Sequence, residues 1–198
     1  MSNLNTAWVT RADSRRYTAG ARAARKTGFE FGALVKTSPA TGPVILGLVD
    51  EVAVAENLAA RQMVAAGLVD HSFRAWNLMD IGVTVTGWRE HGGAIRYGLP
   101  PQPPVGLETV QVCHPAELLD FSRSLTYLPL LLNSQNGRAD QLIIAHLLRA
   151  GLVRPLELRA RFVREVGRRL TRHLHRDLRR LEQILTAVVT GIRAGESG

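Results

Sequence analysis

The segment Tyr97–Cys113, with the sequence YGLPPQPPVGLETVQVC, decides how the chain on either side of it is organised. Four of the nine prolines of the chain lie in its first half. Proline has no backbone N–H and a fixed φ angle, so this stretch cannot lie inside a β-sheet and predicts a stiff, extended connector. Gly106 then allows the chain to turn into ETVQVC, whose β-branched residues are typical of a short strand.

The sequence just before this connector predicts a β-hairpin. In residues 81–99, IGVTVTGWREHGGAIRYGL, apolar residues alternate with polar or small ones on both sides of Gly92 and Gly93. Two adjacent glycines can adopt the positive φ angles of a tight turn between antiparallel strands.

Two earlier runs predict further strands. Residues 28–36 alternate in hydropathy, and residues 44–55 follow them after a turn rich in Pro, Thr and Gly. Gly47 in the second run suits a bulge of the kind that small barrels need. Residues 55–73 have helical spacing of apolar residues and predict a helical insertion. Together these patterns predict an antiparallel-rich β-barrel over residues 28–113.

After His114 the period of the apolar residues changes from two to 3.6, which indicates helices. Pro115 and Glu117 are typical of the first turn of a helix, here in PAELLDF. Residues 138–151, RADQLIIAHLLRAG, place apolar side chains on one helix face, with Gly151 as the expected end. The apolar positions of that face are Ala139, Leu142, Ile143 and Leu147.

Residues 155–193 predict one long amphipathic helix. At 1.5 Å per residue it would be about 55 Å long, which exceeds the width of a small domain. The helix must therefore kink, with Gly167 as the obvious point, protrude, or pair with another helix. Its continuous apolar stripe favours pairing with a second chain. The residues expected to mediate this self-association are Leu170, Leu174, Leu181, Leu185 and Val188.

The formal net charge is +8, and arginines supply 23 of the 25 basic side chains. Residues 159–180 contain nine arginines against two acidic residues, which accounts for nearly the whole net charge. Such a concentration predicts DNA or another acidic partner, and the alternative is a solvated helix face. The residues expected to bind this partner are Arg161, Arg164, Arg168, Arg169, Arg172, Arg176, Arg179 and Arg180.

One stretch comes close to a phosphate-binding loop. Gly20, Lys26 and Thr27 have the spacing of G-x-x-x-x-G-K-[ST], but Arg25 stands where the second glycine should be. The sequence that follows is typical of a strand, whereas a phosphate-binding loop needs a helix whose N-terminus faces the phosphates. We therefore expect no ATP binding and no ATP hydrolysis.

Other residues that carry chemistry in enzymes are scattered. Cys113 follows a β-branched run and is expected to be a buried, inert thiol. His173 and His175 are two residues apart on a predicted helix, so they point about 200° apart and cannot share a metal. Asp50 and Glu51 are adjacent on a predicted strand, so their side chains should face apart. We expect no catalytic residues, no metal site and no cofactor, and therefore expect that the protein is not an enzyme.

The composition and the start of the sequence indicate where in the cell the protein is expected. The sequence contains no run of 18 apolar residues, so we expect no membrane span. Its start lacks the pattern of a secretory signal, and a single cysteine fits a reducing cytoplasm, so we expect a cytoplasmic protein. Residues 1–27 are polar and basic, and they predict a flexible arm.

The order of these segments resembles a known family. Residues 32–52, GALVKTSPATGPVILGLVDEV, are followed by the hairpin, by residues 99–112, LPPQPPVGLETVQV, and by residues 114–121, HPAELLDF. This order resembles the HAS-barrel, the small β-barrel at the N-terminus of HerA-type hexameric DNA translocases. In that family the barrel helps subunits to assemble and offers a docking surface to a partner nuclease of the NurA type. The family continues into an ATPase core, whereas this chain continues into helices, so the resemblance implies a barrel without its motor.

The sequence thus predicts an α+β protein in three parts: a basic arm (1–27), a HAS-like β-barrel (28–121) and a helical C-terminal region with a long amphipathic helix (122–198). We expect a non-catalytic assembly or adaptor protein of a DNA-processing machine, which associates with itself and with an ATPase or nuclease. The alternative is direct nucleic-acid binding by the arginine-rich helix. Affinity that falls steeply as the salt concentration rises would favour the alternative, because protein binding releases the cations condensed on the phosphates of the nucleic acid.

Overall fold

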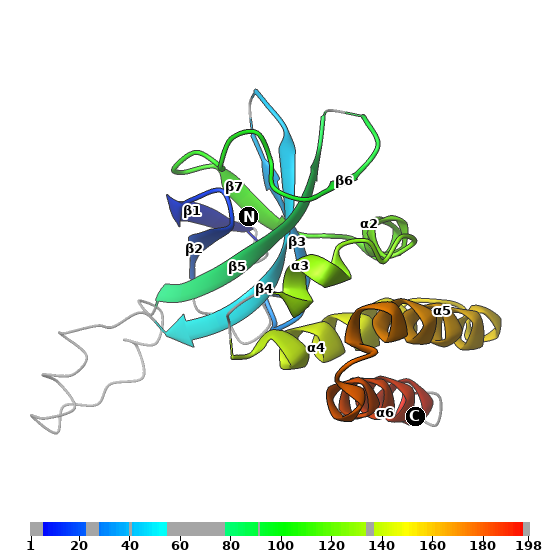
Figure 1. Ribbon diagram of the computed structural model, residues 1–198. Helices are drawn as coiled ribbons and strands as arrows, with labels where there is room; N and C mark the ends of the chain where they lie inside the picture. Colours follow the sequence, from blue (N-terminus) through cyan, green and yellow to red (C-terminus); the bar gives the residue numbers. More distant parts are fainter. Residues whose placement is uncertain are drawn as a thin grey trace, which may run out of the picture.

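The computed structural model describes residues 6–22, 28–39, 41–54, 78–90, 92–133 and 137–195. In Figure 1 the strands form a barrel, and the helices gather beside and below it. The strands are β1 (Thr6–Ala12), β2 (Arg16–Arg22), β3 (Leu34–Ser38), β4 (Val44–Val54), β5 (Leu78–Arg89), β6 (Arg96–Tyr97) and β7 (Thr109–Val112). The helices are α2 (Pro115–Phe121), α3 (Leu128–Leu132), α4 (Ala139–Leu152), α5 (Leu156–Leu174) and α6 (Leu178–Ala194).

Six of the strands close into an antiparallel barrel. The strand order is β2-β1-β7-β3-β4-β5-β6, and β2 also pairs with β5, which closes the ring and leaves β6 as an attachment to β5. Every pairing among the described strands is antiparallel. The predicted fold class, a small β-barrel followed by a helical region, is confirmed.

The prediction of a flexible arm over residues 1–27 is wrong for residues 6–22, because they form β1 and β2. These two strands complete the barrel, so the strands after residue 28 do not close it alone. The inward positions carry mostly small side chains, which fit the interior of a narrow barrel, and exposed arginines (Arg11, Arg16 and Arg22) lie near the ends of these strands. The alternation typical of strands is therefore weak in this basic segment. The inward residues are Ala7, Val9, Tyr17, Ala19 and Ala21.

Two details of β3 and β4 depend on glycine. The predicted bulge at Gly47 is confirmed, because the pairing with β5 shifts register between Leu46 and Gly47. A Cβ atom on Gly47 would lie 2.5 Å from Cγ1 of Val83. β3 begins at Leu34 and not at residue 28, because Gly32 has a φ angle of 81°, which interrupts an extended strand.

The hairpin and the connector agree with the sequence. β5 pairs with the short β6, and Gly92 in the turn has a φ angle of 71°. The proline-rich connector then leads to β7, which lies between β1 and β3. The predicted helical insertion over residues 55–73 lies outside the described residues.

The first three helices cover one side of the barrel. α2 begins with Pro115 and Glu117 as predicted, and the Glu117 side chain accepts a hydrogen bond from the His114 N–H at 2.9 Å. α4 buries its predicted apolar face, although it ends one residue after Gly151. α3 was not anticipated, since LPLLL carries no helical periodicity. These helices pack on outward-facing residues of the barrel such as Leu34, Leu46 and Leu48.

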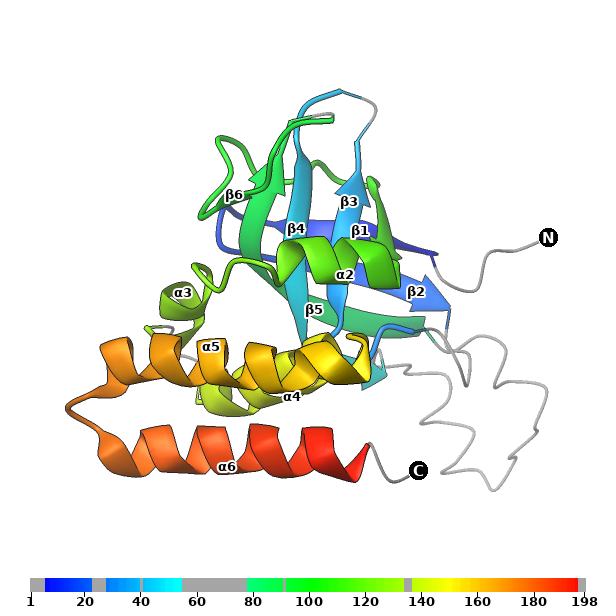
Figure 2. The same ribbon diagram turned by 90° about the vertical axis from the view of Figure 1, so that its right-hand side faces the viewer.

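The single long helix over residues 155–193 is a wrong prediction. The chain forms two helices, α5 and α6, which run antiparallel to each other and pack beside α4 (Figure 2). The break lies at His175–Asp177 and not at Gly167. Asp177 is the N-cap of α6, because its carboxylate accepts a hydrogen bond from the Arg180 N–H at 3.1 Å. An N-cap aspartate in the middle of an apolar stripe is a helix start signal that the continuous periodicity concealed.

Candidate nucleic-acid interface

The α5 helix separates apolar and basic residues onto opposite sides. Phe162, Val166, Leu170 and Leu174 follow one another at steps of four and are all buried. Because 3.6 residues make one turn, residues 161, 164, 168 and 172 lie on the opposite side. All four are exposed arginines. We call Arg161, Arg164, Arg168 and Arg172 the arginine face.

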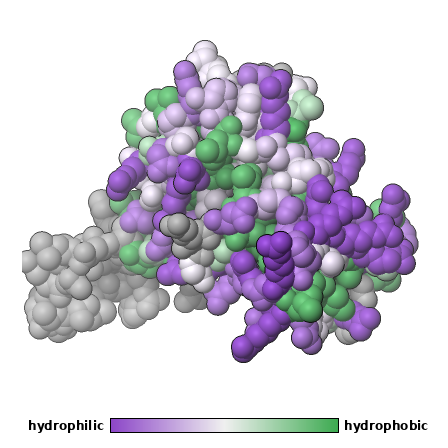
Figure 3. All heavy atoms as spheres, viewed as in Figure 1, coloured by the Kyte–Doolittle hydropathy of each residue, from purple (hydrophilic) through white to green (hydrophobic). Residues whose placement is uncertain are grey.

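The arginine face is long and weakly neutralised. It extends over about 16 Å at 1.5 Å per residue. Arg168 lies 3.8 Å from Glu165, in an exposed pair of a kind that contributes little stability. Arg161, Arg164 and Arg172 form no ion pair within the described part of the chain. Figure 3 shows hydrophilic residues gathered over the helical part of the molecule.

The other predicted arginines lie elsewhere or are already occupied. Arg176 is exposed in the turn between α5 and α6, and Arg179 is exposed in the first turn of α6. Arg169 is half-buried, and its Nε atom is buried without a hydrogen-bond partner. Arg180 binds Asp140 of α4 through Nε and Nη2, with the Nη2 to Oδ1 distance at 2.6 Å. That hydrogen bond raises the pKa of Arg180, which therefore joins α6 to α4.

A groove lies along one side of the arginine face. It has a volume of about 900 Å³ and separates the start of α5 from the turn that joins α2 to α3. We call it the arginine groove. Its lining consists of Ser122, Arg123, Leu125, Arg154, Leu158, Arg161, Phe162, Arg164, Glu165 and Arg168.

Arg154 is the most firmly held cation of this groove. Its Nη2 atom donates to the backbone oxygen and to Oγ of Ser122, both at 3.0 Å, and Nη1 donates to the carbonyl of Ala150. The guanidinium lies 3.9 Å from the ring centre of Phe162. Burial lowers the pKa of Arg154, but a guanidinium stays charged at neutral pH. Arg154 thus holds a positive charge without a carboxylate partner among the described residues.

Sequence reasoning missed Arg123 and Arg154. Arg154 follows the end of α4, where basic side chains commonly bind the last carbonyl groups of a helix. That signal was available in the sequence. No comparable signal exists for Arg123, which reaches the groove only because the α2–α3 turn packs near α5.

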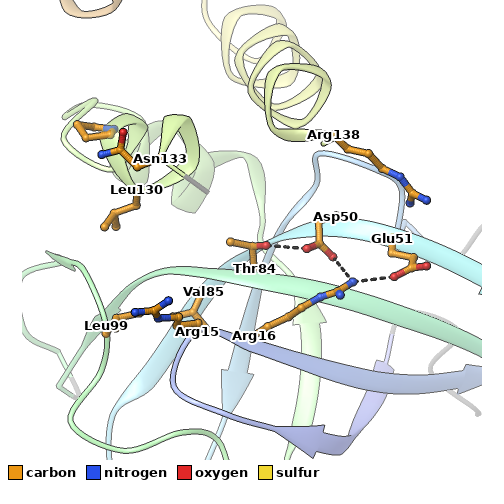
Figure 4. Close-up of a pocket in the computed structure, with 11 residues that line it drawn as sticks. Arg15, Arg16, Asp50, Glu51, Thr84, Val85, Leu99, Leu130, Asn133 and Arg138 are labelled. Carbon is orange, nitrogen blue, oxygen red and sulfur yellow. Dashed lines mark hydrogen bonds and ion pairs between the residues drawn. The ribbon is translucent and has the colours of Figure 1, made fainter. Parts of the chain in front are cut away.

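A second pocket lies between the barrel and α3, and Figure 4 shows its charged residues. Asp50 is 1% exposed and accepts hydrogen bonds from Oγ1 of Thr84 at 2.6 Å and from Arg16 at 3.1 Å. Arg16 also donates to Glu51 at 2.7 Å. The prediction that Asp50 and Glu51 face apart is wrong, because Asp50 is the extra residue of a bulge where Val49 pairs with Val83 and Glu51 with Gly82.

This ion-pair cluster joins β2, β4 and β5. The glycine at position 82 makes room for it, since a Cβ atom there would lie 2.5 Å from Nη2 of Arg16. The buried carboxylate of Asp50 has partners on both oxygens. We conclude that the cluster stabilises the barrel.

Cys113 and His146 are kept neutral by burial. Burial raises the pKa of Cys113 to about 12, so its thiol is neutral. Burial lowers the pKa of His146 to about 4, and both ring nitrogens have partners. Among the described residues, no three His, Cys, Asp or Glu side chains lie close enough to hold a metal ion. Gly20 lies within β2, and residues 23–27 of the near-match to a phosphate-binding loop lie outside the described residues.

The apolar stripe expected to mediate self-association is covered by the chain itself. Four of its members are buried between α4, α5 and α6, and Leu185 is half-buried against the same cluster. A second chain could reach them only if α5 and α6 separated, so self-association stays a prediction. The four buried members are Leu170, Leu174, Leu181 and Val188.

No helix in the described ranges combines the length and the hydropathy that a membrane crossing requires. No protein-family model matches this chain, and no curated protein matches it either. The barrel is therefore established by its strand pairing, and its resemblance to the HAS-barrel rests on the sequence pattern.

Proposed function

We propose that this protein is a non-enzymatic component of a DNA-processing assembly and that it binds nucleic acid through the arginine face. The observation that carries the proposal is the alignment of four exposed arginines on one side of α5. Three of them have no ion pair in the described ranges, so their charge is free for an acidic partner. Phosphate groups suit such a row because Arg binds them with two parallel hydrogen bonds.

The rest of the molecule supports binding over catalysis. The barrel interior is filled by its own apolar side chains, such as Tyr17, Ile81 and Val83. Asp50 is neutralised by an ion pair, His146 is buried, and the Cys113 thiol is protonated. Asp50 lines the pocket between the barrel and α3, but both of its carboxylate oxygens already have partners, as expected of a structural residue.

The test is fluorescence anisotropy with a labelled oligonucleotide at several salt concentrations. We expect the logarithm of the binding constant to fall linearly with the logarithm of the salt concentration, because cations leave the phosphates on binding. Arg164→Glu with Arg168→Glu should weaken binding by at least about tenfold. The matched control is Arg11→Glu with Arg15→Glu, which makes the same charge change at exposed positions of the barrel. Equal losses in both double variants, or no binding by the wild type, would contradict the proposal.

A second candidate function is the adaptor role that the HAS-barrel resemblance implies. The proline-rich connector exposes Leu99, Val105 and Leu107, the last with 78% of its surface in solvent. Leu107 also has a φ angle of 68°, an unfavourable conformation for a branched residue, and its N–H donates to the Val9 carbonyl at 2.8 Å. Exposed apolar side chains on a strained, fixed loop favour contact with a protein partner.

The adaptor role is tested by purification from native lysate, with and without nuclease treatment. We expect a translocase ATPase or a nuclease to co-purify with the protein at high salt. This association should persist after the lysate is treated with nuclease. Val105→Asp with Leu107→Asp should abolish that association without lowering oligonucleotide affinity. Loss of every co-purified protein after nuclease treatment would favour nucleic-acid binding alone.

A further inference from the structure

The arginine groove concentrates positive charge from three separate segments. Arg161, Arg164 and Arg168 come from α5, Arg123 comes from the α2–α3 turn, and Arg154 lies between α4 and α5. Figure 2 shows α2 and α3 on the barrel side of α5, and the turn between α2 and α3 supplies Ser122, Arg123 and Leu125 to the groove lining. Charge that converges across a concave surface attracts an anion more strongly than the same charge on a convex helix.

The acidic residues near the groove neutralise little of this charge. Glu165 lies 3.8 Å from Arg168, and Asp120 lies 3.8 Å from Arg123. Both pairs are exposed and connect residues three positions apart, so they are readily exchanged for another anion. Five arginines therefore face a single glutamate in the lining of the groove.

Arg154 offers a fixed cation for that anion. Three of its N–H groups are used by Ala150 and Ser122, and the stacking on Phe162 holds the guanidinium plane. An arginine has five N–H groups, so roughly two remain for a ligand. A cation fixed in advance loses little conformational freedom when an anion binds.

The groove also contains apolar surface beside its charges, supplied by Leu158. The Leu158 side chain is 46% exposed, whereas Leu125, which also lines the groove, is only 2% exposed. A single strand of nucleic acid has this combination, since its phosphates are charged and its unpaired bases have apolar faces. In a duplex the bases are stacked inside, so a duplex could use only the exposed arginine face of α5 and not the interior of the groove.

We propose that the arginine groove binds a single strand of nucleic acid, with the phosphates along Arg161, Arg164 and Arg168 and unpaired bases against Leu158. Arg123 closes the other side of the groove, and Arg154 contributes the fixed charge. This inference rests on the proposed function and narrows its ligand from nucleic acid in general to single strands. Phe162 is covered by Arg154, so the groove offers no open aromatic ring for stacking and should discriminate little between bases.

The experiment measures anisotropy of the full chain with labelled dT15 and with a 15-base-pair duplex, at about 50 mM salt. We expect dT15 to bind about tenfold more tightly than the duplex, because only the single strand can use both parts of the groove. Arg123→Glu should weaken dT15 binding by about tenfold and duplex binding by less than about twofold. Arg123 has 81% of its side chain exposed, so this variant should fold.

The matched control is Arg176→Glu, an exposed arginine outside the groove lining, which should weaken both ligands equally. Equal affinity for the two ligands, or equal effects of the two variants, would overturn the groove assignment and leave the proposed function intact. Binding of neither ligand would overturn both. Tighter binding of a polyglutamate peptide than of dT15 would also overturn the inference, because the groove would then be a site for acidic proteins.

Discussion

The Nδ1 atom of His146 lies 3.3 Å from the carbonyl oxygen of Gly32, and this contact joins α4 to the turn that precedes β3. Because a carbonyl can only accept, Nδ1 carries the proton, and Nε2 accepts from the Tyr127 hydroxyl at 2.9 Å. Phe121 and Tyr127 surround the imidazole edge-on. His146 thus fixes the junction between barrel and helices in its neutral form.

This geometry predicts a loss of stability in mild acid. Burial lowers the pKa of His146 to about 4, while an unfolded histidine titrates near 6.5. Between these values the unfolded chain binds a proton that the folded chain refuses, so stability is full above about pH 7 and falls as the pH drops. The expected loss between pH 7 and pH 5 is about 2 kcal/mol.

Urea unfolding at pH 7, 6 and 5 measures this loss. His146→Gln keeps an amide donor at the junction but cannot titrate, so its unfolding free energy should change less over the same range. Equal pH slopes for the wild type and His146→Gln would show that other groups cause the dependence.

A second prediction concerns the other partner of this contact. Gly32 has a φ angle of 81°, and a Cβ atom on it would lie 2.6 Å from Cβ of Ala145. Gly32→Ala should cost at least about 3 kcal/mol, because backbone strain and steric overlap add. Gly42→Ala is the matched control, since Gly42 has a φ angle of 96° but open space around it. Its cost should be about 1 kcal/mol, and similar melting temperatures for both variants would contradict the packing argument.

The sequence predicts the parts of the fold that depend on strong local signals and misses those that depend on long-range pairing. The connector after Tyr97 and the bulge at Gly47 follow from backbone rules for proline and glycine, which hold in any context. β1 and β2 were missed because alanines between arginines have a weak hydrophobic period. Their strand character comes from pairing with β5 and β7, which is a long-range effect.

The candidate nucleic-acid interface likewise combines features set by the local sequence with features set by long-range packing. The spacing of arginines along α5 is local, so the row from Arg161 to Arg172 could be predicted from helical periodicity. The engagement of Arg180 by Asp140 could not, since the two residues are 40 positions apart. The groove forms only because the α2–α3 turn, which carries Arg123, lies near α5, and this long-range packing could not be predicted from the sequence.

A third prediction separates intramolecular packing from self-association in α6. Leu181 is 8% exposed and packs in the helical core, whereas Leu178 is 67% exposed on the same helix. Leu181→Ala should cost about 2–4 kcal/mol through cavity formation. Leu178→Ala should cost less than about 1 kcal/mol. Light scattering reports the oligomeric state in parallel: a wild-type oligomer that becomes a folded monomer in Leu181→Ala would favour a shared stripe over an internal one.

The last prediction compares two arginines that the sequence treats alike. Arg164 is exposed without an ion pair in the described ranges, whereas Arg180 is held by Asp140 at 2.6 Å. If Arg164 contacts a phosphate, Arg164→Gln should lower the slope of log affinity against log salt by about 0.7 to 0.9, the contribution of one released cation. Arg180→Gln should leave that slope unchanged, because its charge is already neutralised, and should lower stability by about 1–2 kcal/mol through loss of the tie between α4 and α6. Salt titrations and urea unfolding of both variants separate the two roles. A lower salt slope for Arg180→Gln with unchanged stability would mean that Asp140 yields Arg180 to the nucleic acid and that the interface extends onto α6.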